Sequence, residues 1–204
     1  MTINLRQPPA WAQSLLHLLL KQEDQETVSG DLLEEYREEI LPSRGQRGAD
    51  LWYVKQMAGF LWFVTAPFGC LLAAAIVVRF LIDVFVPTTN FVQRSELSTV
   101  SGAAIYALAG AYCASRTGHV RSGMLAAVGS SLFAGVVNIV VTMVILAVRH
   151  DPRTLDAIRA SGGLDEHLTL VLFPLLPGGV LLATIGGFLG KGLSRRAGSA
   201  ARRS

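Results

Sequence analysis

Four carboxylates lie close together in the stretch GDLLEEYREEI, at Glu34, Glu35, Glu38 and Glu39. On a helix this spacing places all four on one face. Paired carboxylates serve as general acids and bases and as ligands of divalent cations. No histidine stands at a matching spacing, and no apolar residues surround these groups to perturb their pKa values. The pattern therefore favours a solvated helix face that docks a partner over a catalytic or metal site.

Polar residues inside the long apolar stretches form a second, smaller set. Arg79 and Asp83 are four residues apart and can pair on one helix face, with Arg79 reaching toward lipid headgroups. Asn138 lies near the middle of its stretch, where we expect it to hydrogen-bond across a helix bundle. No Asp, Glu or Lys occupies the middle of any apolar stretch. This pattern argues against proton-coupled or cation-coupled transport.

Sequence signatures of catalysis are missing. The chain contains no HExxH, GxSxG, GxxxxGK[ST] or CxxC motif. Its cysteines, Cys70 and Cys113, both lie in apolar stretches, where thiols act as small packing residues. His17 has no second ligand at metal-binding spacing. We therefore predict a protein that is not an enzyme and that binds neither a cofactor nor a metal.

The elements that carry these residues are predicted to be membrane helices behind a polar N-terminal domain. The chain has 204 residues, of which 51% are hydrophobic and only 16% charged. From Met57 to Val78 no charge interrupts the sequence, and about 20 apolar helical residues cross a bilayer. Similar stretches predict membrane helices at about 57–82, 97–115, 122–148 and 168–189. The expected fold is all-α, with residues 1–56 as a small helical domain, 57–190 as a four-helix transmembrane bundle and 191–204 as a basic tail.

Small residues recur every four positions on the last three of these segments, for example at Ala103, Ala107 and Ala111 and at Gly179, Ala183 and Gly187. In lipid, such stripes let helix backbones approach closely. The stripes are consistent with packing inside one chain and with self-association of two copies.

The N-terminal domain resembles a known family. The residues that carry the resemblance are Pro8-Pro9, Leu15-Leu16, Glu23-Asp24, Gly30-Asp31-Leu32, Glu34-Glu35-Tyr36, Ala49, Trp52-Tyr53 and Gln56. Over residues 7 to 56 this pattern is similar to the permease prefix domain, a helical cytoplasmic module that precedes some bacterial ABC-type permeases. No large extracytoplasmic domain follows the first apolar stretch here. The resemblance implies a short form, in which the prefix is joined to a small membrane bundle and has a permease or its ATPase as a partner.

The distribution of positive charge predicts the orientation. The N-terminal region, the turn from Arg116 to Arg121 and the tail hold 13 of the 18 Lys and Arg residues. Since cytoplasmic loops are rich in Lys and Arg, both ends of this multi-pass protein should lie in the cytoplasm, at the cell membrane. The basic residues flank apolar segments, so their partner is expected to be the lipid bilayer and not nucleic acid.

Two functions remain open from the sequence. The first is a non-enzymatic, membrane-anchored interaction or regulatory module that docks a partner through the acidic helix. The alternative is a small oligomeric transporter or channel subunit, in which helices interrupted at Pro67, Pro174 and Pro177 line a path.

Overall fold

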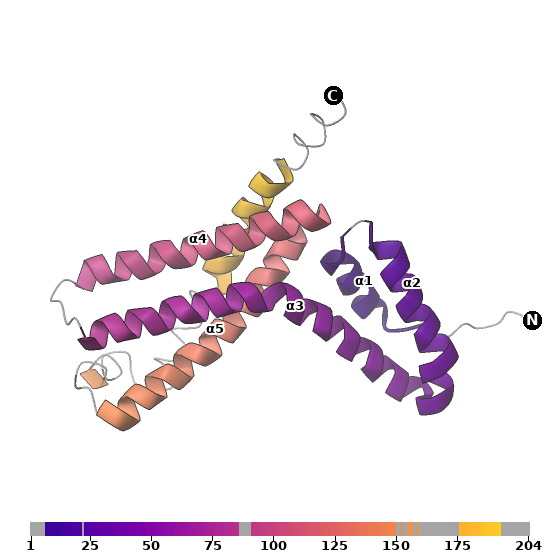
Figure 1. Cartoon of the computed structure of the whole chain (residues 1–204), viewed down its shortest axis with the longest axis horizontal. Coiled ribbons are helices and arrows are strands. Elements are labelled where there is room, and N and C mark those ends of the chain that lie inside the picture. Colours follow the sequence, from indigo (N-terminus) through magenta and orange to yellow (C-terminus); the bar gives the residue numbers. More distant parts are fainter. Residues whose placement is uncertain are drawn as a thin grey trace, which may run out of the picture.

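A computed structural model of the chain describes residues 7–21, 23–85, 91–149, 152, 155, 156, 159 and 176–192. Within these ranges every regular element is a helix. The prediction of an all-helical protein is confirmed for this part of the chain. Figure 1 shows two regions: a compact group of helices near the N-terminus, and a longer group that contains the rest of the described chain.

Three elements precede the long helices: α1 (Ala10–Leu19), α2 (Gln25–Glu35) and the π-helical turn η1 (Tyr36–Ile40). The sequence predicts a broad apolar face on α1, with Trp11, Leu15, Leu18 and Leu19 at its centre and Ala12, Leu16 and Leu20 beside them. The structure buries Ala12, Leu16, Leu19 and Leu20 of this set, whereas Trp11 is 57% exposed. The small side chain of Ala12 lets α1 lie close to its neighbours, which turns Trp11 outward. Helix α2 continues through Gly30 without a break.

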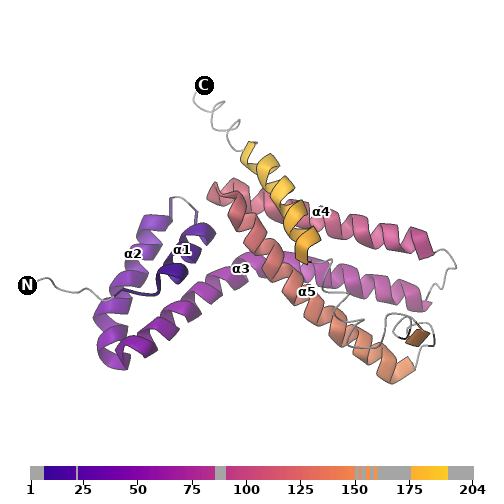
Figure 2. The ribbon, with the colours of Figure 1, turned by 180° about the vertical axis from the view of Figure 1, so that it is seen from behind.

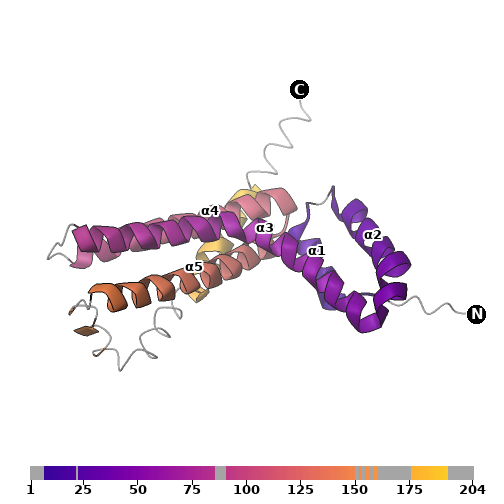
Figure 3. The same ribbon diagram turned by 60° about the horizontal axis from the view of Figure 1, so that its bottom comes forward.

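A corner at Gly45 folds α2 and η1 back along the following helix (Figures 1 and 3). Helix α3 (Leu41–Phe85) is interrupted there, with φ 66° and ψ 177°, a conformation that only glycine adopts readily. Pro42, Gly45 and Gly48 in the sequence predict a turn over residues 41–48, and the change of direction occurs within it. The chain is helical on both sides of Gly45, and the helix then continues across Pro67.

The second region contains the rest of α3, α4 (Phe91–Thr117), α5 (Val120–Arg149) and the helical residues 176–192. Figures 1 and 2 show α4 running back alongside α3 toward the N-terminal helices. A tight turn then starts α5. Gly118 has φ 74°, and its N–H donates to Ala114 O at 2.9 Å. The Thr117 and Ser122 hydroxyls lie 2.6 Å apart across this turn, which confirms the predicted tight connection.

The two regions have separate hydrophobic cores. The N-terminal core contains Ala12, Leu16, Leu20, Tyr36, Ile40, Ala49, Tyr53 and Met57. The core of the second region contains Leu72, Tyr106, Ala127, Ala134 and Ala183. Met57, the first residue of the predicted membrane helix, thus packs with the N-terminal domain. Helix α3 supplies residues to both cores.

Two helical segments, Gln25–Ile82 and Val120–Ala147, are long and apolar enough to cross a membrane. They contain the predicted membrane segments at 57–82 and, except for its last residue, at 122–148. The other two predicted segments, 97–115 and 168–189, include residues whose placement or side chains the structure does not describe. The four-helix transmembrane bundle therefore stays a prediction at this point.

Small residues do join two of the helices closely. An added Cβ at Gly186 or Gly190 would overlap the carbonyl oxygen of Ala107 or Ala111 on α4. At Gly179 it would lie 2.7 Å from the Tyr106 ring. Residue numbers rise together along this contact, so α4 and residues 176–192 run in the same direction. Of the two uses that the stripes left open, packing inside one chain and self-association, this contact is packing inside one chain.

Candidate functional site

The predicted docking residues all lie at the surface. Glu34 and Glu35 end α2, Glu38 and Glu39 lie in η1, and all four side chains are exposed. We call these four residues the acidic face. Between them, Arg37 is half-buried, and its buried Nε atom has no hydrogen-bond partner among the described residues. Isolated π-helical turns of this kind occur often at functional sites.

The acidic face stands on a core that holds a polar network. The fully buried Tyr36 donates its hydroxyl to Asp50 Oδ1 at 2.6 Å. Gln46 Nε2 donates to the Tyr36 hydroxyl at 2.8 Å and to Asp50 Oδ1 at 2.9 Å. The network therefore links η1 to the first turns of α3 after the Gly45 corner. The sequence analysis missed Gln46 and Asp50, although their i, i+4 spacing and the nearby Tyr36 were visible.

Aromatic packing supports the same contact. The rings of Tyr36 and Tyr53 meet edge to face, with centroids 6.0 Å apart and planes at 89°. Burial raises the pKa of Tyr53 above its usual value, so its hydroxyl stays neutral over a wider pH range. Of the residues that carry the family resemblance, Tyr36, Ala49 and Tyr53 are buried together in this core. Their spacing in the sequence reflects packing of η1 on α3.

The structure describes the predicted intramembrane residues only in part. Arg79 is exposed on α3. The side chain of Asp83 lies outside the described residues, so the predicted pair is not tested. Asn138 is half-buried on α5, but no hydrogen bond joins its side chain to another described residue.

Other residues make the hydrogen bonds that we had expected of Asn138. The hydroxyls of Tyr106 and Ser131 lie 2.7 Å apart between α4 and α5. Ser130 donates to the carbonyl oxygen of Thr65 at 3.1 Å, joining α5 to α3. The buried hydroxyls of Ser130 and Ser131 thus each have a hydrogen-bond partner on a neighbouring helix, which offsets the cost of burying them.

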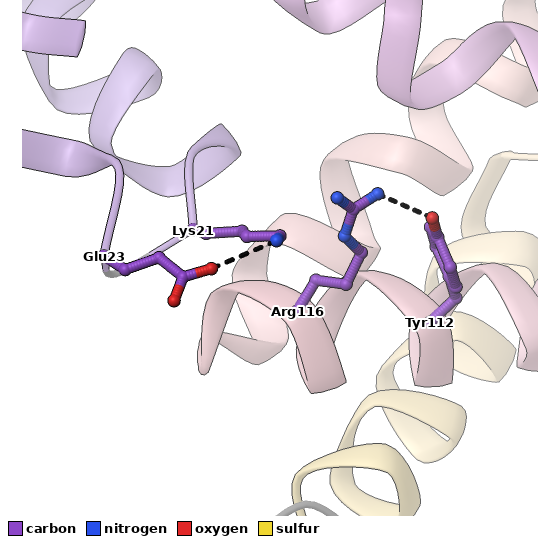
Figure 4. Close-up of polar contacts among 4 residues, drawn as sticks. All are labelled: Lys21, Glu23, Tyr112 and Arg116. Carbon is purple, nitrogen blue, oxygen red and sulfur yellow. Dashed lines mark hydrogen bonds and ion pairs between the residues drawn. The ribbon is translucent and has the colours of Figure 1, made fainter. Parts of the chain in front are cut away.

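A cleft that the sequence did not predict lies between the two regions. It is an open cleft of about 590 Å³, and Lys21, Glu23, Ser115 and Arg116 line it. We call it the junction cleft. Lys21 and Glu23 come from the connection between α1 and α2, and Ser115 and Arg116 from the last turn of α4. Figure 4 shows the Lys21 and Arg116 side chains pointing toward the same space. Residues so far apart in the sequence give no local signal.

The described residues contain no group of three or more His, Cys, Asp or Glu that could hold a metal ion. Cys70 is exposed and Cys113 is buried, and the two are not joined by a disulfide. The charged side chains of the acidic face and the junction cleft can bind a partner through charge and hydrogen bonds.

No protein-family model matches this chain, and no curated protein or solved structure shows significant similarity to it. The resemblance to the permease prefix domain thus remains a prediction from the residues quoted above.

Proposed function

We propose that this chain is a multi-pass membrane protein whose N-terminal domain is a non-enzymatic docking and regulatory module. In this proposal the acidic face binds a basic surface on a membrane transporter, such as an ABC-type permease or its ATPase. Both chain ends lie in the cytoplasm, and the second region forms a transmembrane bundle.

Membrane insertion is supported by large apolar side chains on the outside of the second region. Exposed examples occur on each of its helices, including Phe63, Leu108, Val136 and Phe188, which are 61–74% exposed. In the most apolar window of each candidate span, only 22% and 28% of the residues are buried. The core helix of a soluble protein is mostly buried, whereas lipid covers such apolar surface.

The observation that carries the docking proposal is the exposure of all four side chains of the acidic face on a domain with its own core. Like charges four residues apart on a helix repel one another and cost a few tenths of a kcal/mol per pair. A basic partner would offset that repulsion on binding. The separate core lets the domain present this face without help from the bundle.

The regulatory part of the proposal rests on α3. From Gln46 onward its backbone is helical through to Phe85. Tyr53 and Met57 belong to the N-terminal core, and Leu72 belongs to the core of the second region. A partner that moved the N-terminal domain would therefore move one end of a helix that the bundle holds at the other end.

A transporter or channel has less support. The polar side chains buried between α3, α4 and α5 include Tyr106, Ser130 and Ser131, and each is engaged in a hydrogen bond with a neighbouring helix. Polar groups paired in this way hold helices together, and they do not line a hydrated path.

The test is co-purification from native membranes with the acidic face neutralised. Glutamine at Glu34, Glu35, Glu38 and Glu39 should release associated transport proteins from the tagged full-length chain. The control neutralises three other exposed acids, Asp24 just before α2 and Glu26 and Asp31 within it, and should retain the associated proteins. Equal recovery from both variants would refute docking through the acidic face. Equal thermal unfolding of both variants would show that the released chain is still folded.

A further inference from the structure

The junction cleft carries two cationic side chains and one carboxylate. Lys21 Nζ lies 3.1 Å from Glu23 Oε1, and the side chain of Glu23 is 73% exposed. Arg116 has no acidic partner among the described residues. Its Nη1 donates to the Tyr112 hydroxyl at 2.6 Å, and its guanidinium lies 5.4 Å from the centroid of the same ring. The cleft therefore has an excess of positive charge that the described chain does not neutralise.

Neighbouring contacts limit where the exposed side chain of Arg116 can go. It precedes Thr117, whose hydroxyl donates to Cys113 O at 2.9 Å and lies 2.6 Å from that of Ser122. Contact with the Tyr112 ring further limits the side chain. A guanidinium has five N–H donors, and only one donates to Tyr112. The others are available to a tetrahedral oxyanion in the cleft, which arginine binds with paired hydrogen bonds.

An apolar track leads away from this charge along α4. Leu108, Tyr112 and Arg116 are spaced four residues apart, so they follow one stripe of the helix. Leu108 is 62% exposed and Tyr112 50% exposed. The Phe68 ring of α3 lies beside Tyr112, with centroids 5.9 Å apart. A cationic end followed by an apolar stripe matches a molecule with an anionic head and a hydrocarbon tail.

We propose that the junction cleft binds the phosphate of an anionic phospholipid between Lys21 and Arg116, with its acyl chains along Leu108 and Tyr112. Basic pockets beside membrane helices on the cytoplasmic side recognise such headgroups. The proposal rests on the membrane placement proposed above. Lys21 belongs to the N-terminal domain and Arg116 to the bundle, so a bound lipid ties the two regions together. Lipid composition would then set how firmly the N-terminal domain is held.

The experiment measures lipid binding to the purified full-length chain in detergent by native mass spectrometry and by thermal unfolding. The probes are dioleoylphosphatidylglycerol, dioleoylphosphatidylcholine and inorganic phosphate. We expect the phosphatidylglycerol to bind and to raise the unfolding temperature, and the other two probes to have little effect. In the variant Lys21→Gln/Arg116→Gln, affinity for phosphatidylglycerol should fall roughly fivefold for each charge removed.

The matched control is Arg44→Gln/Arg121→Gln. It removes the same charge from two exposed residues, one in the N-terminal domain and one after the α4–α5 turn, that do not line the cleft. The control should bind as the unchanged protein does, and Lys21→Arg/Arg116→Lys should retain most of the affinity because the charges remain. An equal loss in the control would refute the site, since binding would then be diffuse.

Two further outcomes separate the proposals. If inorganic phosphate stabilises the chain as well as phosphatidylglycerol does, the ligand is a soluble anion and the lipid assignment is wrong. Carbonate extraction of native membranes tests the placement on which the assignment rests. A chain released by carbonate would refute membrane insertion itself, whereas a retained chain that is indifferent to phosphatidylglycerol would refute only the cleft.

Discussion

At the residue scale, Tyr36 joins the packing and the polar network of the N-terminal domain. Its ring is fully buried against Tyr53, and its hydroxyl joins Asp50 and Gln46. Without this hydroxyl, the half-buried Asp50 Oδ1 loses one of its two donors and Gln46 Nε2 loses one of its two acceptors, and partly desolvated groups that lose a partner cost free energy. The hydroxyl therefore matters to stability apart from the packing of the ring.

We predict that Tyr36→Phe lowers the free energy of unfolding of the N-terminal domain by about 1–3 kcal/mol. The control is Tyr53→Phe, which removes a hydroxyl from an equally buried ring. No hydrogen bond joins that hydroxyl to another described residue. Denaturant unfolding, followed by tyrosine and tryptophan fluorescence, measures both. Similar losses in the two variants would contradict the importance of the network.

At the scale of elements, two glycines in the N-terminal domain have opposite roles. Gly45 makes the corner between η1 and the rest of α3, with φ 66°. Gly30 lies inside α2, is exposed, and has nothing within 4 Å of an added Cβ. At residue 45 the positive φ of the backbone requires glycine, whereas glycine at residue 30 only lowers the stability of α2.

Alanine should therefore act in opposite directions at these positions. Gly45→Ala should destabilise the domain by about 1–3 kcal/mol, because an L side chain is strained at this φ and ψ. Gly30→Ala should stabilise it by up to about 1 kcal/mol through helix propensity. Circular dichroism during thermal unfolding gives both signs. A stabilising Gly45→Ala would mean that the chain does not turn at this residue.

The contact between α4 and residues 176–192 gives a second test at this scale. Gly186→Ala would drive a methyl group into the carbonyl of Ala107, and a backbone atom cannot move aside as a flexible side chain does. We expect a loss of about 1–3 kcal/mol, the usual cost of overpacking. Gly178→Ala, on the same helical segment with nothing within 4 Å, should change little. The unfolding temperatures of the two variants are measured in detergent. Equal temperatures would show that this contact does not contribute to stability.

At the scale of the whole molecule, the arrangement of the helices bears on which end faces the cytoplasm. The N-terminal helices, the α4–α5 turn and the C-terminal end of residues 176–192 lie toward one end of the second region (Figures 1 and 2). Such an arrangement is what alternating membrane helices produce when their number is even. The excess of Lys and Arg in these parts predicts that this end is cytoplasmic.

Cysteine labelling of intact cells measures this orientation. In a background with Cys70 and Cys113 replaced by alanine, a cysteine at Thr88 should react with an impermeant maleimide. Cysteines at Glu26 and at Ser199 should react only after the cells are opened. Labelling of Glu26→Cys from outside would reverse the orientation and would place the acidic face away from cytoplasmic partners.

The sequence by itself determined the features that depend on neighbouring residues. Helix periodicity, the uncharged stretch from Met57 to Val78, and the small-residue stripes are local patterns, and each predicted an element or a type of packing. The four acids of the acidic face were identified in the same way, since their spacing alone places them on one exposed face. Pro42, Gly45 and Gly48 likewise predicted the turn between the N-terminal helices and the long part of α3.

Only the tertiary structure decided which distant residues meet. Tyr36, Gln46 and Asp50 form a network because Gly45 turns the chain back by one particular angle, and no local pattern encodes that angle. The outward turn of Trp11 depends on how closely Ala12 lets α1 approach its neighbours. Lys21 and Arg116 share a cleft because α3 and α4 return the chain to its starting side. Contacts across such long sequence separations are set by packing between helices, and packing is a property of the folded chain.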